Sequence, residues 1–292
     1  MGGGHPCTGI CTLSLSLLAL LTAAAVHARS PQMHRLEATP ATIVYGYYWS
    51  EAPPALRIAS GDVIDVDTLL TNTPEGLAKA GVPDDRIQTS LKEIVSQVTG
   101  DRGGPGGHIL RGPVYVEGAE PGDVLFGSMG VAPAPEAGHV SSNPPGRHAG
   151  NLDNRELVAG STLYIPVFAR GALFEVGDGH VAQGNGEFDQ TAIETSLRAR
   201  LQLTVRKDMK LTWPRAETPT DYISMATDPD LNVATRTAIQ EMVDFLVTEK
   251  QLTHHEAYQL VSIAGNVAIT QRVDKPNVGV HVRLPKSIFV PR

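Results

Sequence analysis

The stretch from Leu163 to Glu194 constrains this chain most, because it places several carboxylates and an imidazole between two runs of strand-forming residues. Beyond it, apolar and polar side chains alternate from Leu197 to Arg206, which predicts a half-buried strand. Successive side chains of a strand point to opposite faces, and Asp178 and His180 keep the parity of the apolar residues before them. We therefore expect both side chains where an apolar strand face ends.

A glycine-rich turn, Gly184-Asn185-Gly186, separates the two runs, and its Asn-Gly pair is a strong hairpin signal. The register of the later strand, read backwards, puts Glu187 and Asp189 on the apolar face as well. Carboxylates and an imidazole at the open end of a hairpin predict an ion-binding or catalytic pocket. The alternative is a set of solvated loop residues, with a parity that a single bulge would destroy.

The whole chain has 29 glycines, 21 prolines and 5% aromatic residues, a composition typical of a turn-rich β protein. Residues 32–41 read as a polar lead-in and 71–80 as a loop. Helical spacing of apolar residues predicts one short helix within 84–98. A long segment with little periodicity, 131–149, is expected to be a covering or functional loop. Strands are expected at 42–48, 56–58, 63–70, 113–117 and 124–126.

The last third has a different pattern, with two helices and a closing strand. Asp230 is the expected cap of a helix that runs to about Lys250. Thr253 and Glu256 form a capping-box pattern that begins a second helix. Alternation over 278–284 predicts the final strand, with His281 on its polar face. The sequence therefore predicts a mainly β fold over residues 29–215, which carries the catalytic site, and a smaller C-terminal α/β portion, residues 216–292, packed on it.

The first residues predict export. The apolar run at 13–26 is short for a membrane span, and Val26-His27-Ala28 places small residues at the −3 and −1 positions of a signal-peptidase site. We expect residues 1–28 to be a signal peptide cleaved near Ala28, although its first part lacks Lys and Arg. The mature protein would be periplasmic or secreted, without a membrane segment. It would also be cysteine-free, because Cys7 and Cys11 both precede the cleavage site.

The charge pattern excludes some partners. The formal net charge is −7 and charged residues make up 19% of the chain, so it has no basic footprint for a nucleic acid. The sequence contains no G-x-S-x-G nucleophile motif, no H-E-x-x-H zinc motif, no Walker loop and no dinucleotide-binding fingerprint after a strand. What remains is a set of oxygen and imidazole donors: Asp153, Asp178, His180 and Glu187, with Asn151 and Gln183 beside them.

Two or three carboxylates with one histidine are typical ligands of a catalytic Zn²⁺, or of a harder divalent ion such as Ca²⁺ or Mn²⁺. An unligated glutamate nearby could act as general base. Such a site could hydrolyse a small amide or ester without a nucleophilic side chain. His180 could also be a hydrogen-bonded histidine at a strand end, and Asp178 a turn residue. Glu187 facing inward is harder to explain in this way, because a buried carboxylate needs a partner charge.

The chain resembles the acetamidase/formamidase family of amide hydrolases. The resemblance lies in GPVYVEGAEPGDVL (112–125), HAGNLD (148–153), GALFEVGDGHVAQGNGEFDQTAIE (171–194) and the tail from Pro219, in collinear order. It implies a sandwich- or barrel-like β fold with a smaller α/β portion. It also implies a homo-oligomer, dimeric or larger, and metal-assisted hydrolysis of short amides to a carboxylate and ammonia.

The matching positions suggest roles. The family's Gly-Asn-x-Asp, Gly-Asp-x-His-x-x-Gln and glycine-turn elements match residues 150–153, 177–183 and 184–187. We expect Asp153, Asp178 and His180 to bind the metal and Glu187 to act as general base. The side chains expected to bind or orient the substrate are His108, Asn151, Gln183 and Glu194.

Two positions depart from the family pattern. Asn185 stands where the family commonly has Asp, and Val44 and Tyr45 stand where it often has a histidine, a role that His108 could take. The alternative hypotheses are therefore a non-catalytic, exported protein that binds a small molecule, and a hydrolase of another C–N bond or of an ester.

Overall fold

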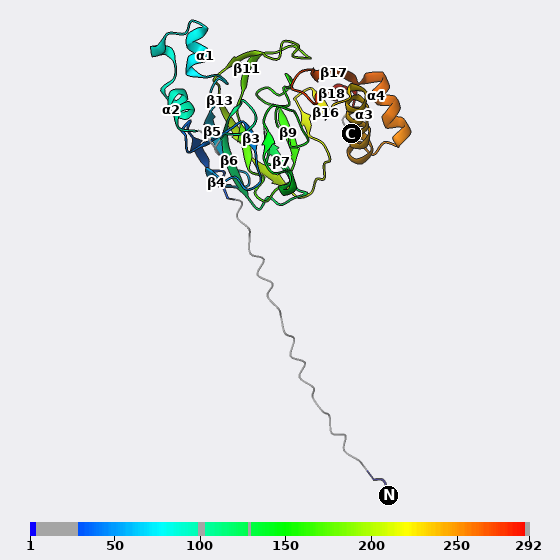
Figure 1. Cartoon of the computed structure of the whole chain (residues 1–292). Coiled ribbons are helices and arrows are strands. Elements are labelled where there is room, and N and C mark those ends of the chain that lie inside the picture. Colours follow the sequence, from blue (N-terminus) through cyan, green and yellow to red (C-terminus); the bar gives the residue numbers. More distant parts are fainter. Residues whose placement is uncertain (4–28, 99–102, 128–129, 290–292) are drawn as a thin grey trace. The chain divides into compact units, whose positions relative to one another are not determined.

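A computed structural model describes residues 1–3, 29–98, 103–127 and 130–289 (Figure 1). The chain divides into Met1–Ser30 and a compact unit, Pro31–Arg292, that contains the described helices and strands. The signal peptide expected at residues 1–28 lies outside the described residues except for the first three. Within the described ranges, no helix has the length and apolarity that crossing a membrane requires.

The largest sheet has seven antiparallel strands and continues through the C-terminal third of the chain. Its order is β14 (Thr204–Arg206), β7 (Val124–Gly127), β9 (Thr162–Pro166), β15 (Arg215–Glu217), β16 (Asp221–Asp228), β18 (Val278–Pro285) and β17 (Asn266–Gln271).

The other described strands form four smaller sheets. One contains β10 (Phe174–Val176), β6 (Ile109–Glu117) and β2 (Ile43–Tyr45), with β4 (Leu56–Ala59) parallel to β6. A second contains β1 (Met33–Leu36), β5 (Val63–Asp67) and β13 (Arg198–Gln202). Two pairs complete the set: β11 (Gly179–Ala182) with β12 (Ile193–Thr195), and β3 (Tyr47–Tyr48) with β8 (Val140–Ser141).

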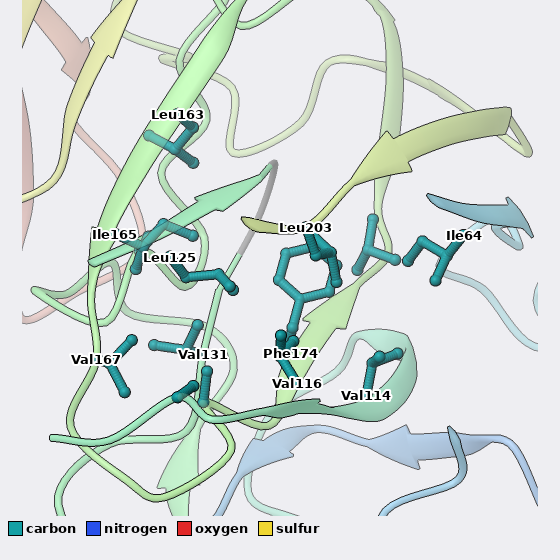
Figure 2. Packing of buried hydrophobic residues seen from close by; sticks show 14 of the residues in the cluster. Ile64, Val114, Val116, Leu125, Val131, Leu163, Ile165, Val167, Phe174 and Leu203 are labelled. Atoms are coloured by element: carbon teal, nitrogen blue, oxygen red, sulfur yellow. The ribbon is translucent and has the colours of Figure 1, made fainter. Parts of the chain in front are cut away.

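The main core lies where these sheets contact one another. Figure 2 shows Ile64, Val114, Leu125, Ile165 and Phe174, which come from five strands of three different sheets and are fully buried. Burial of such side chains stabilises the fold by about 1.5–3 kcal/mol each. The predicted mainly β, sandwich-like fold is confirmed.

The C-terminal helices pack on the large sheet. α3 (Leu231–Lys250) buries Met242 and Leu246 in one cluster with Val280 and Val282 of β18, and α4 (His254–Ala264) adds Val261. Both predicted caps are present. The Asp230 side chain accepts from the Asn232 N–H at 2.7 Å, and Thr253 and Glu256 form the reciprocal capping box.

Three expectations about local structure were wrong. Residues 71–80 contain a short helix, α1 (Pro74–Lys79), because Thr73 caps it and Pro74 fits its first turn. Part of the polar lead-in forms β1, which pairs with β5. The short helix predicted within 84–98, by contrast, is confirmed as α2 (Thr89–Gln97), which buries Leu91 and Ile94 and follows a 3₁₀ turn (Asp84–Arg86). His281 was expected on a polar face but is 1% exposed, because consecutive residues 278–282 of β18 are buried and both faces of this strand are therefore covered.

The strand expected over 42–48 is interrupted at Gly46, which adopts φ +80°. Its N–H donates to the His108 carbonyl at 2.8 Å, and its carbonyl accepts from Gly106 and Ser142 at 2.8 and 3.1 Å. A Cβ at Gly46 would lie 2.3 Å from the Gly106 carbonyl oxygen. Glycine here allows the chain to approach the segment that carries His108.

Gly46→Ala should lower the free energy of unfolding by more than the matched control Gly61→Ala. Gly61 also has a positive φ, +93°, but nothing lies within 4 Å of its Cβ position. The control should cost about 1–2 kcal/mol from backbone strain alone, and Gly46→Ala about 1–3 kcal/mol more from overpacking. Urea unfolding measures both, and equal losses would contradict the close-approach explanation.

Candidate functional site

Three parts of the sequence meet at one polar cluster: residues 151–153, residues 178–187 and the turn that contains Asp274. Hydrogen bonds of Gln183 join the first two. Its Nε2 donates to the Asp153 carbonyl at 2.5 Å, and its Oε1 lies 3.0 Å from His180 Nδ1. Glu187 has a carboxylate oxygen within 4.8 Å of ligand atoms of Asp153 and His180, and Asp274 accepts a hydrogen bond from Asn151. Both ends of the Gln183 amide are therefore engaged within the chain.

Asp178 lies between two imidazoles. Its Oδ2 is 3.3 Å from His180 Nε2 and 3.6 Å from His108 Nε2, and His108 Nδ1 is 2.8 Å from Ser142 Oγ. Burial would raise the pKa of Asp178, but the hydrogen bond from His180 and the neighbouring His108 lower it overall. Burial likewise opposes protonation of His180, and hydrogen bonds to Asp178 and Gln183 raise its pKa to about 9.

The site side chains are presented by left-handed backbone. Asn151, Asp153, Asp178 and Glu187 have φ values of 46°, 43°, 51° and 43°. Strand parity does not continue through such residues, so the shared face inferred for Asp178 and His180 has no basis in a continuous strand. The two side chains nevertheless meet, because β11 starts directly after the turn at Asp178.

The hairpin expected between the two strand-forming runs was wrong: residues 198–202 and 204–206 form β13 and β14, which pair with β5 and β7 instead. Asn185-Gly186 is therefore not a two-residue hairpin turn. β11 pairs with β12, with His180 opposite Glu194, and ten residues connect the two strands. Glu187 is buried, at 8% exposure, as expected, although it lies in this connection rather than on a strand. Asp189 is exposed, so its expected place on the apolar face was wrong.

Glu187 and Asp153 form the acidic half of the cluster. Burial, followed by the charges of Glu187 and Asp178, raises the pKa of Asp153 well above its usual range. Burial also raises the pKa of Glu187 to about 7, with a further contribution from Asp274. The pKa of Asp274 is itself raised by burial. These carboxyl groups are held in a place where several negative charges cannot all persist without a cation.

Two triads of side chains are spaced for a metal ion. Asp153, His180 and Glu187 form one, and Asp178, His180 and Glu194 the other, each with its ligand atoms within 4.8 Å of one another. The expected ligands Asp153, Asp178 and His180 are thus divided between two triads that share His180.

Two carboxylate oxygens of the cluster lack a hydrogen-bond partner within the described part of the chain, which also fits a bound cation. Asp178 Oδ1 and Glu187 Oε2 are buried and have no hydrogen-bond partner among the described residues. A buried carboxylate oxygen without a partner is costly, and each of these oxygens could be satisfied by a divalent cation or a proton.

Asp274 is a site residue that the sequence patterns did not identify. Its Oδ2 accepts from Asn151 Nδ2 at 3.1 Å, and the same Nδ2 donates to the Asn143 carbonyl at 2.6 Å. Asp274 lies between β17 and β18, at least 80 residues after every site position that was predicted from the sequence. No periodicity or motif marks it, so only the fold reveals it.

A second group missed from sequence lies close by and is buried. Glu175 is 0% exposed, and both carboxyl oxygens lack a partner within the described ranges. Burial, then the charges of Glu175, Asp178 and Asp153, raises the pKa of Tyr48. Its ring packs edge-on against His148, 4.8 Å between centroids, and burial lowers the pKa of His148 to about 4. These groups form a buried surround in which burial disfavours the charged forms of Tyr48, His148 and Glu175.

Comparison with known proteins identifies relatives of this arrangement. The Acetamidase/Formamidase family profile matches residues 134–290. A formamidase of Methylophilus methylotrophus is 28% identical over 171 residues, which cover 50% of this chain and 41% of that enzyme. An acetamidase of Mycolicibacterium smegmatis is 41% identical over 46 residues, 16% of this chain and 11% of that enzyme. The matches thus span less than half the length of either relative.

Solved structures share the fold. A predicted acetamidase/formamidase of Thermoanaerobacter tengcongensis has a TM-score of 0.73 at 24% identity, covering 89% of this chain and 97% of that one. An acetamidase of Yersinia enterocolitica has a TM-score of 0.74 at 21% identity, covering 90% and 95%.

The raised pKa of Glu187 predicts how the stability of the metal-free protein depends on pH. Between about pH 4.5 and 7 the folded protein holds a proton that the unfolded chain has lost, so stability from this group falls as pH rises through that window. Glu187→Gln removes this loss. The variant should gain up to about 3 kcal/mol over wild type between pH 4.5 and 8, measured by urea unfolding. Identical pH profiles of unfolding free energy in wild type and Glu187→Gln would contradict the raised pKa of Glu187. Asp189→Asn, which removes an exposed carboxylate, is the control.

Proposed function

This chain belongs to the acetamidase/formamidase family, and we propose that it is a metal-dependent hydrolase of small linear amides, of the formamide and acetamide type, that releases a carboxylate and ammonia. The single observation that carries the proposal is the pair of buried, unpartnered oxygens, Asp178 Oδ1 and Glu187 Oε2, beside the shared imidazole of His180. The Asp178 oxygen fits the role of a cation ligand, and the Glu187 oxygen fits the role of a proton acceptor.

In this proposal Asp153, Asp178 and His180 hold a divalent ion, Zn²⁺ in the first place, with Ca²⁺ or Mn²⁺ as alternatives. When bound, the ion would polarise the amide carbonyl and lower the pKa of a water toward about 7. Glu187 would take the proton of the attacking water at Oε2 and deliver it to the departing nitrogen, as a general base and then acid. Gln183 would keep His180 in place, since it already contacts Nδ1.

Substrate orientation falls to the remaining polar groups. Asn151 uses its Nδ2 for Asn143 and Asp274, which leaves its Oδ1 to accept from the substrate N–H₂. His108 and Glu194 would contact the substrate from the sides of Asp178 and His180. His108 directly precedes β6, and Leu110 of β6 pairs with the buried Val44, so His108 can supply the imidazole that position 44 lacks.

The proposal extends to location and assembly. Residues 1–28 would export the protein to the periplasm or the medium. A homo-oligomer, dimeric or larger, is supported by large apolar side chains that are exposed on the β11–β12 hairpin and its connection: Val181 at 65%, Phe188 at 73% and Ile193 at 64%.

Val44 favours a second candidate. The buried valine leaves one family position without an imidazole, which would suit an exported protein that binds a small molecule without turnover, or a hydrolase of another C–N bond or of an ester.

Ammonia release from formamide, acetamide and propionamide distinguishes these functions. The mature protein should release ammonia, lose this activity after chelation and regain it with Zn²⁺ or another divalent ion. A folded, metal-loaded protein that releases none, but whose melting temperature rises with an amide, would instead be a binding protein.

Glu187→Gln should reduce kcat for the best amide by about 10²–10⁴-fold, the usual size of a general-base contribution. Metal content measured by mass spectrometry should stay near that of wild type. Asp189→Asn, an exposed carboxylate two residues away, is the matched control and should keep wild-type kcat. Retained activity in Glu187→Gln would show that another group moves the proton.

A further inference from the structure

The end of β17 and the turn after it contact the segment that carries Glu187. The Gly186 N–H donates to the Thr270 carbonyl at 3.0 Å, and the Arg272 N–H donates to the Gly186 carbonyl at 2.8 Å. These bonds form a parallel bridge between Gly186 and Gln271. The position of the Glu187 turn is therefore fixed from the C-terminal part of the chain.

The same five residues, 270–274, also reach the segment that carries Asp153. Gln271 is fully buried, and its Nε2 donates to the Asn151 carbonyl at 3.4 Å. Asp274 accepts from the Asn151 side chain at 3.1 Å. Asn151 is thus held at its backbone and at its side chain, two residues before Asp153.

We propose that Asp274 is a positioning residue of the metal site, which holds the Asn151–Asp153 turn in register with the Gly186–Glu187 turn. It does so as a hydrogen-bond acceptor for Asn151, as part of residues 270–274, which bind both turns. The inference rests on the proposed function only in taking Asp153 as a metal ligand.

The backbone explains why such a residue is needed. Asn151, Asp153, Glu187 and Asp274 itself all have φ between 43° and 56°. Left-handed non-glycine residues cost about 1–3 kcal/mol each and persist only where the surroundings hold them. Loss of the Asp274 acceptor would allow the Asn151–Asp153 turn to relax, and the Asp153 carboxylate would move away from His180 and Glu187.

The test is the zinc affinity of the full mature chain, measured by competition with a chromophoric chelator in the absence of substrate. Asp274→Ala should weaken binding about 10–100-fold, the size seen when an outer partner of a metal ligand is removed. Asp274→Asn keeps an acceptor oxygen for Asn151 and should stay within about threefold of wild type. Asp244→Ala, an exposed carboxylate on α3, is the matched control and should bind as wild type does.

A double-variant cycle tests the route through Asn151. Asn151→Ala should weaken zinc binding as Asp274→Ala does. The double variant should bind zinc no more than about threefold more weakly than the weaker-binding single variant, because each substitution removes the same Asn151–Asp274 hydrogen bond. If Asp274→Ala unfolds, the comparison of Asn151→Ala with Asp274→Asn gives the same answer.

Three results would overturn the proposal: unchanged affinity in Asp274→Ala, equal losses in Asp274→Asn and Asp274→Ala, or additive losses in the double variant. A wild-type chain that binds no zinc would overturn it as well. If the variants show the expected zinc affinities but the wild-type protein releases no ammonia, the positioning role of Asp274 stands and the proposed amidase activity is rejected.

Discussion

Left-handed backbone at the site is the constraint on which the rest of the structure depends. Five polar residues of the cluster, Asn151, Asp153, Asp178, Glu187 and Asp274, have positive φ. Asn and Asp adopt this conformation more readily than most residues, but Glu does not, and none does so without cost. The surrounding sheets provide the rigid ends between which these turns are held. Gln183 and residues 270–274 provide the hydrogen bonds that keep them in place.

The electrostatics follow from the same convergence. Turns that aim side chains at one point bring like charges together, and burial then raises the pKa values of Asp153, Glu187 and Asp274. Asp178 differs because two imidazoles face it, and its pKa is lowered. The result is an acidic half and an imidazole half, with His180 in both metal-spaced triads. Such an arrangement is costly for stability and suits a bound cation.

Local signals in the sequence predicted local structure well. The Thr253–Glu256 capping box and the Asp230 cap depend on residues within one turn, and both occur as expected. Parity arguments failed where the backbone left the extended region, as at Asp178, or where a strand had both faces covered, as at His281. Glu187 is buried as expected, but a loop places it there. Asp274 could not have been predicted, because its role exists only once β17 brings its turn to a site built more than 80 residues earlier.

The central claim is that these left-handed turns assemble donors for one divalent ion, and anomalous diffraction from zinc-loaded crystals of the mature protein tests it most directly. The account predicts a zinc peak about 2.0–2.2 Å from an imidazole nitrogen of His180 and from a carboxylate oxygen of the same cluster. It also predicts that Asn151, Asp153 and Glu187 keep their left-handed conformation. A zinc ion bound elsewhere, or no ion in this cluster at saturating zinc, would contradict it.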